Sequence, residues 1–210
     1  MDFALTEEQQ LIIKTTRDFV RQELVPHERE VEDTGRLRDD LLQDLRKKAM
    51  AAGLYAANMP VEVGGAGLDA VSWVLYEKEL GYTSYVLHYA CVARPSNILL
   101  ACTGAQRERY LLPAVRGERV ECLAMTEPQA GSDLRSMRTS AVAQGGDFIL
   151  NGTKHFISHA DHADFAIVFA ATCRRVAPSQ VLAPSKPWCT SPSTADCGSR
   201  QSLNCRMLLV

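Results

Sequence analysis

The chain lacks long apolar runs and an excess of charge of either sign. No apolar run is long enough to cross a bilayer, and Met1–Thr6 has none of the basic, apolar and small-residue stages of a signal peptide. The formal net charge of −2 gives no indication of nucleic-acid binding. We therefore expect a soluble, cytoplasmic protein that binds neither nucleic acid nor a membrane.

The cysteines do not indicate a disulfide scaffold. The 7 cysteines are odd in number, and no two of them form a Cys-x-x-Cys pair. Cys91, Cys102 and Cys122 lie in apolar surroundings, which predicts small buried side chains. The other four fall within residues 173–210, where the composition changes.

The first half of the chain has the apolar spacing of amphipathic helices. Thr6 with Gln9 forms a capping box, and Pro26 is expected to end the helix that begins there. Asp69 can cap a later helix. Helices are predicted over residues 6–26, 39–52, 69–81, 85–100 and 103–117.

The periodicity then changes to the alternation of strands. Gly145-Gly146 and Asn151-Gly152 are turn signals of the tight-hairpin kind. Strands are predicted over Cys122–Thr126, Thr139–Ala143, Phe148–Leu150 and Phe165–Ala171. The fold class is therefore α+β by segregation, with an all-α domain over residues 1–119, an incomplete antiparallel β domain over 120–172 and an irregular tail over 173–210.

Three segments carry the information about function. Leu123–Asp133 runs from a predicted strand through a Glu-Pro turn into a loop of small residues, which exposes backbone N–H groups and hydroxyls to a ligand. Asn151–Ser158 follows it, and the glycine-rich Pro60–Gly67 precedes it. These segments resemble the acyl-CoA dehydrogenase patterns T-E-P-x-A-G-S-D, N-G-x-K-x-[W/F]-I-[T/S] and P-x-E-x-G-G-x-G, and the resemblance runs from Met1 to about Thr172.

The resemblance implies a flavoprotein oxidoreductase of fatty acid metabolism that uses FAD. Thr126 would bond the N1/O2 edge of the flavin and Ser158 its N5, with the Phe156 ring beside the isoalloxazine. Ser132 would contact both the FAD pyrophosphate and the acyl-CoA. The cofactor-binding residues implied in this way are Leu123, Met125, Thr126, Gly131, Ser132, Phe156, Ile157 and Ser158.

The family reaction removes a proton from the α carbon and a hydride from the β carbon of an acyl-CoA thioester. Its catalytic glutamate belongs to a C-terminal helical domain that we do not find here, so no catalytic residue is assigned. We expect this chain alone to be inactive. The resemblance further implies an electron-transfer flavoprotein type of acceptor for the full-length form, and homo-oligomers only when the C-terminal domain is present.

Three alternatives stay open at this point. The chain can be a non-enzymatic fragment or a helical interaction module, or it can belong to the related acyl-CoA oxidases or flavin monooxygenases. The tail can be a disordered extension. We favour a reading-frame shift near Thr172, which the absence of dehydrogenase-like helical sequence in the other two downstream frames would refute.

The remaining polar groups point to other roles. We interpret Glu127 and Asp133 as loop formers and Glu62 as structural, not as an acid and a base. A zinc site would be possible if residues 155–162 were helical, but the Asn-Gly turn and the alternation after it favour extended chain, so no metal is expected. The candidate ligands of that rejected site are His155, His159, His162, Asp161 and Asp164.

Overall fold

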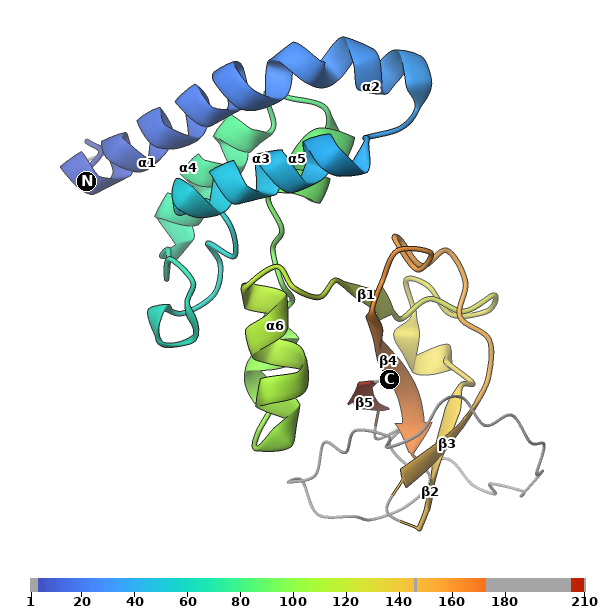
Figure 1. Ribbon diagram of the computed structural model, residues 1–210. Helices are drawn as coiled ribbons and strands as arrows, with labels where there is room; N and C mark the ends of the chain where they lie inside the picture. Colours follow the sequence, from blue (N-terminus) through green and yellow to red (C-terminus); the bar gives the residue numbers. More distant parts are fainter. Residues whose placement is uncertain (1–3, 146, 173–204, 210) are drawn as a thin grey trace. The chain divides into compact units, whose positions relative to one another are not determined.

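The computed structural model describes residues 4–145 and 147–172 and, for their backbone only, residues 205–209. The chain divides into two compact units, one of Met1–Leu100 with Leu112–Glu118 and one of Ala101–Leu111 with Arg119–Val210. The first unit is helical and the second carries the sheet (Figure 1). This succession confirms the predicted segregation of helices and strands.

The α-helices follow one another along the first unit. They are α1 (Glu7–Phe19), α2 (Glu28–Thr34), α3 (Asp39–Ala51), α4 (Ala70–Leu80), α5 (Tyr85–Cys91) and α6 (Leu112–Val115). Shorter turns of 3₁₀ or π-helix are η1 (Val20–Leu24), η2 (Val25–His27), η3 (Val61–Val63), η4 (Asn97–Ala101), η5 (Arg107–Leu111) and η6 (Leu134–Ser136).

Local capping signals place the helix starts. The Thr6 hydroxyl accepts a hydrogen bond from the Gln9 N–H at 3.2 Å, and the Gln9 side chain accepts one from the Thr6 N–H at 3.1 Å. The Asp69 carboxylate accepts a bond from the Ser72 N–H at 2.8 Å at the start of α4. Both predicted caps are confirmed, because each satisfies backbone donors that the helix cannot use.

Two predicted helix ends are wrong, and proline explains both. The chain stays helical through Pro26, and this helical stretch ends at Thr34. Pro26 lies in the first turn of a new helical segment, where its missing N–H would have no partner within the helix. The predicted helix over 85–100 instead stops at Cys91. Pro95 disfavours helical backbone in the residue before it, and η4 begins only at Asn97.

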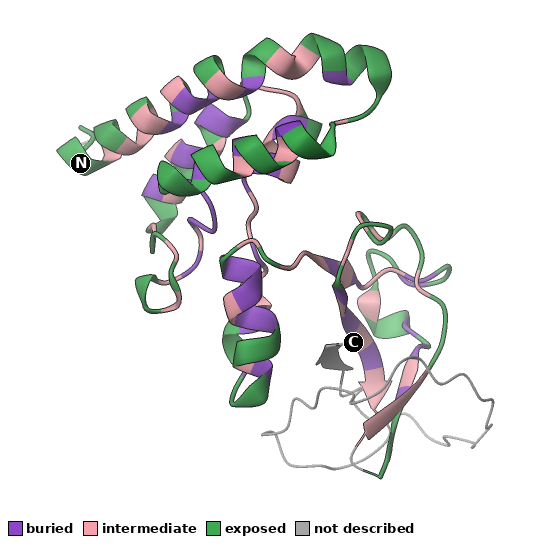
Figure 2. Cartoon of the chain, in the orientation of Figure 1, coloured by how far each residue is buried: buried purple, intermediate pink, exposed green. Residues whose placement is uncertain are grey.

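The helical unit packs around one apolar core. Tyr76 and Leu80 of α4 are fully buried, and the Tyr76 hydroxyl donates to the Leu54 carbonyl at 2.7 Å. Gly65 belongs to the glycine-rich connection, where an added Cβ would lie 2.0 Å from the Met59 carbonyl oxygen. That motif therefore serves close packing of the chain. Figure 2 shows the buried positions in purple; the core also includes Phe19, Val20, Leu24, Val31, Leu45, Leu87 and Cys91.

The second unit holds a mixed sheet. Its strands are β1 (Glu121–Ala124), β2 (Ser140–Gln144), β3 (Asp147–Asn151), β4 (Phe165–Thr172) and β5 (Cys205–Leu209). The order is β1-β4-β2-β3, with β5 also paired to β4. β4 runs parallel to β1 and β2, whereas the β2–β3 and β4–β5 pairs are antiparallel.

The predicted β domain is thus present, but its sheet is not purely antiparallel. Parallel neighbours need long connections, and the stretches 125–139 and 152–164 contribute to such crossovers. The hairpin signal applies only between β2 and β3, where Gly145 has a φ of 58°. β5 was not predicted within the tail; residues 173–204 and 210, and with them the frame-shift hypothesis, lie outside the described residues.

Candidate functional site

The loop that leaves the end of β1 closes on itself at Glu127. The Glu127 N–H donates to the Ala130 carbonyl at 2.8 Å, and the Ala130 N–H donates back at 3.1 Å. Further on, Asp133 caps η6 and accepts a hydrogen bond from the Ser136 hydroxyl at 2.8 Å. The bonds from Ser136 and Arg135 lower the pKa of the Asp133 carboxyl. Both acidic residues therefore shape the loop, as predicted.

Glu127 is the anchor of this loop. Its side chain is 1% exposed and accepts bonds from four donors: the Gln129 amide at 2.7 Å, the Arg138 N–H at 2.6 Å, the Thr139 N–H at 3.0 Å and the Lys154 ammonium at 2.8 Å. Burial acts to raise its pKa, but the bonds from Arg138, Lys154 and Thr139 outweigh it and lower the pKa to about 2. A carboxylate held in this way is a poor proton acceptor.

The structure brings the two segments around Thr126 and Ser158 together. The His155 N–H donates to the Thr126 carbonyl at 2.9 Å. The Lys154 ammonium donates to the Met125 carbonyl at 2.9 Å and also pairs with Glu127. Two backbone carbonyls of the first segment are thus bonded directly by neighbouring residues of the second.

The second segment is irregular, not extended as predicted. Phe156 has a φ of 56° and His159 a φ of 60°, in the left-handed region that a bulky side chain rarely adopts. The Phe156 side chain is 82% exposed, and its ring stacks on His155 with centroids 3.8 Å apart. An exposed aromatic ring on strained backbone is a pattern found at ligand sites.

The other predicted site residues lie along the same two segments. Leu123, Met125 and Thr126 are half-buried. Gly131 and Ser132 are exposed, and an added Cβ at Gly131 would meet no atom within 4 Å. Within the second segment, Ile157 is half-buried and Ser158 is exposed.

Several residues that hold the site together were not predicted to do so. Lys154 stands in the second motif, but the spacing says nothing of its bond to Glu127, 27 positions away. The same holds for the N–H groups of Arg138 and Thr139. Gly152 permits the second segment to pass close to Thr139, because a Cβ at position 152 would lie 2.3 Å from the Thr139 hydroxyl oxygen.

The histidines of this segment do not form a metal site within the part of the chain that the structure describes. Residues 158–162 form turns and no helix, so the spacing needed for zinc is not realised. His162 faces its neighbour Asp161 at 3.2 Å instead. In the described ranges, no helix is long and apolar enough to span a membrane.

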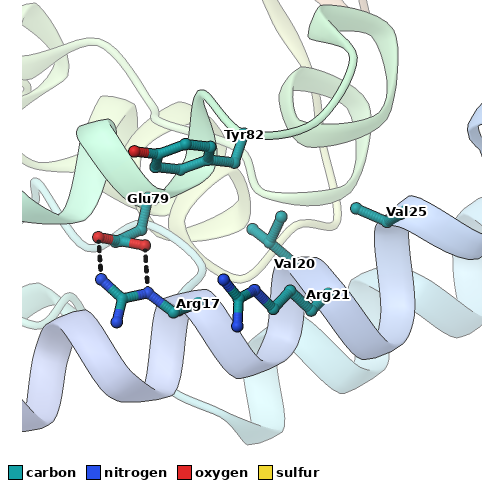
Figure 3. Close-up of a pocket in the computed structure, with 6 residues that line it drawn as sticks. All are labelled: Arg17, Val20, Arg21, Val25, Glu79 and Tyr82. Atoms are coloured by element: carbon teal, nitrogen blue, oxygen red, sulfur yellow. Dashed lines mark hydrogen bonds and ion pairs between the residues drawn. The ribbon is translucent and has the colours of Figure 1, made fainter.

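A surface depression of about 400 Å³ lies in the helical unit (Figure 3). Arg17 of α1 and Glu79 of α4 form a two-point ion pair across it, at 2.9 and 2.8 Å, and Tyr82 lies beside the pair. Glu79 is 2% exposed, and its carboxylate pairs with the Arg17 guanidinium. The depression is also lined by Val20, Arg21 and Val25.

Comparison with known families decides the class of the chain. Residues 6–118 match the model of the acyl-CoA dehydrogenase N-terminal domain, and residues 122–198 match that of the middle domain. The chain belongs to the acyl-CoA dehydrogenase family. The middle-domain match reaches residue 198, beyond the end of the resemblance placed at Thr172.

Individual relatives match most of the chain. The chain is 38% identical to 3-(aryl)acrylate reductase of Clostridium sporogenes, covering 80% of the chain and 44% of the relative. It is 34% identical to the caffeyl-CoA reductase-Etf complex subunit CarC of Acetobacterium woodii, with 80% and 44% covered. A glutaryl-CoA dehydrogenase from Mycobacterium smegmatis in complex with FADH2 superposes with a TM-score of 0.68 at 29% identity, covering 80% of this chain and 43% of that one. The chain spans about half the length of the curated relatives it matches.

Proposed function

We propose that this chain supplies the flavin-facing segments of an FAD-dependent acyl-CoA dehydrogenase, which desaturates the α,β bond of an acyl-CoA thioester. The observation that carries the proposal is the direct bonding of the second segment to the first, through the His155 N–H and the Lys154 ammonium. We place the helical domain at residues 1–119 and the flavin-binding part at 120–172, followed by the tail over 173–210.

The described residues fit such a cofactor. Thr126 accepts a bond at its carbonyl, while its N–H and hydroxyl donate to no other described group. The Phe156 ring offers an exposed face for a flat ring system. The open space at Gly131 allows a phosphate group to approach the backbone.

FAD, when bound, supplies the hydride acceptor of the reaction. Thr126 and Ser158 would donate hydrogen bonds to the polar edges of its ring, and Leu123, Met125, Phe156 and Ile157 would cover its faces. Gly131 and Ser132 would bind the pyrophosphate, with Ser132 also reaching the acyl-CoA. Donors aimed in advance at an edge where negative charge develops are the largest contribution that a protein makes to such chemistry.

We assign no catalytic base. Glu127 and Asp133 are the acidic residues of the first segment, and both are bonded to neighbouring donors. Without a positioned base, the rate falls by roughly two to four orders of magnitude. We therefore expect weak FAD binding, a tendency to aggregate and no measurable turnover from the 210-residue polypeptide alone. In the complete enzyme, we infer an electron-transfer flavoprotein as acceptor, which the name of the CarC relative supports.

Titration of the 210-residue chain with FAD, followed by flavin fluorescence, tests the proposal. We expect weak but saturable binding that Thr126→Ala and Ser158→Ala each weaken by about fivefold, the loss of roughly one hydrogen bond. Thr153→Ala is the matched control, because Thr153 is exposed in the second segment and has no assigned role. Absence of saturable binding, or an equal loss in the control, would refute the proposal. An electron acceptor assay with acyl-CoA should show no activity.

A further inference from the structure

Lys154 is a largely buried cation, and the proposed flavin site does not yet explain its role. Its side chain is 12% exposed, and its ammonium donates to the Met125 carbonyl at 2.9 Å and to the Glu127 carboxylate at 2.8 Å. A buried ammonium group is stable only when it is paired and hydrogen-bonded. Glu127 meets both needs, since three further donors hold that carboxylate in place.

We propose that Lys154 is a positioning residue for the flavin site: it binds the two segments to each other and leaves hydrogen-bond donors, not acceptors, at the edge around Thr126. This inference rests on the proposed function for its ligand. The binding together of the two segments concerns the chain itself and does not depend on any cofactor.

The use of backbone carbonyls supports the proposal. The Lys154 ammonium donates to the Met125 carbonyl. The His155 N–H donates to the Thr126 carbonyl, and the Ala130 N–H donates to the Glu127 carbonyl. Three successive acceptors are therefore bonded within the protein. The N–H and hydroxyl of Thr126 donate to no other group in the described ranges. An edge of this kind favours a ligand edge that carries negative charge.

Loss of the ammonium would leave an unpaired acceptor at this edge. In Lys154→Met the Met125 carbonyl loses its donor and the Glu127 carboxylate loses its counter-charge. Lys154→Gln keeps a donor on a shorter side chain, and Glu127→Gln keeps the Lys154 bond to Met125 but removes its counter-charge. Lys14→Met is the matched control, because Lys14 pairs with Asp18 at 2.6 Å but is 74% exposed.

The first test needs no cofactor. Hydrogen–deuterium exchange of the full chain should show faster exchange in both 123–132 and 152–158 for Lys154→Met, by roughly tenfold. Lys154→Gln should show a smaller increase in both segments and Lys14→Met none, whereas Glu127→Gln should also speed exchange, because Gln129, Arg138 and Thr139 lose their carboxylate acceptor. Faster exchange in only 152–158, or in neither segment, would overturn the proposal. If Lys154→Met fails to fold, Lys154→Gln decides by the same criterion.

The second test compares oxidised and reduced FAD. Reduced FAD carries more negative charge at the ring edge assigned to Thr126, so Lys154→Met should weaken its binding about fivefold more than that of oxidised FAD. Glu127→Gln should shift this ratio in the opposite direction, because it leaves the ammonium charge uncompensated. A purely structural role would weaken both forms equally in both variants, and that result would overturn the donor-edge inference. If the unaltered chain binds no FAD, the proposed function fails, while the exchange experiment still decides whether Lys154 joins the segments.

Discussion

Glu127 is a residue whose surroundings determine what it can do. Glu127 is 3% exposed, and its carboxylate accepts hydrogen bonds from four donors, which hold the loop after β1 in place. A carboxylate acts as a base only when an oxygen is free to accept a proton from a substrate. Residue type and position in a motif are therefore insufficient to assign catalysis.

The pKa of Glu127 leads to a prediction for pH. It is lowered from 4.5 to about 2, so ionised Glu127 stabilises the fold fully above about pH 4.5 and progressively less as the pH falls toward 2. The contribution is at most about 3 kcal/mol. Unfolding of the wild type and Glu127→Gln, measured by urea from pH 6 to pH 2.5, should show a stability difference that shrinks with acid. A difference independent of pH would contradict this assignment.

Alanine substitution at Phe156 and at Phe165 should affect different properties, FAD affinity at the first and fold stability at the second. Phe165 is 4% exposed and packs on Tyr110 with ring centroids 5.0 Å apart, so Phe165→Ala should cost roughly 3 kcal/mol or more of unfolding free energy. Phe156 is 82% exposed, and Phe156→Ala should change stability by less than about 1 kcal/mol. Its effect should instead fall on FAD affinity. Chemical denaturation and FAD titration separate the two, and a large stability loss at Phe156 would argue for a core role.

At the scale of elements, the loops between strands, not the strands themselves, hold the two site segments together. Stretches 125–139 and 152–164 carry the bonds that join the two site segments. Gly152 and Gly131 show how glycine serves two purposes within these loops. Gly152 allows the backbone to pass close to Thr139, whereas Gly131 leaves open space beside the backbone.

Alanine at each of these glycines gives matched expectations. Gly152→Ala would place a Cβ 2.6 Å from the Thr139 Cα and should destabilise the sheet unit by about 1–3 kcal/mol. Gly131→Ala meets no atom within 4 Å, so the fold should tolerate it while FAD affinity falls. Thermal unfolding and FAD titration of both variants check the contrast. Equal destabilisation by the two changes would be inconsistent with the loop geometry.

The sequence predicts what short-range chemistry decides. The capping pair of Thr6 and Gln9, the Asp69 cap and four strands follow from neighbours within a few positions. The mixed strand order, the positive φ of Phe156 and the Lys154–Glu127 pair do not, because each depends on contacts between distant parts of the chain. The two site segments are recognisable by resemblance, whereas the bonds that join them connect residues at least 27 positions apart, which no local pattern predicts.

At the scale of the whole molecule, the two units make their own stabilising contacts. The helical unit contains the Arg17–Glu79 pair between α1 and α4, and the sheet unit contains the Lys154–Glu127 pair. Each pair contains a buried carboxylate, and removing the cation from such a pair destabilises the part of the fold that contains it. Variants of the two cations should therefore have separable effects.

Arg17→Met should lower the unfolding temperature of the helical unit, because it leaves the 2% exposed Glu79 carboxylate without its partner. Lys14→Met on the same helix removes an exposed pair and should have little effect. Hydrogen exchange in α1 and α4 reports the loss directly. Equal effects of the two variants would show that burial of Glu79 does not matter to the helical unit.

Backbone amide NMR of the 210-residue chain during FAD titration tests most directly whether the two segments form one flavin surface. The amide signals of Thr126 and Ser158 should shift together and fit a single dissociation constant, while those of α1 and α3 stay unchanged. Shifts at only one of the two residues, or two different dissociation constants, would contradict a shared site.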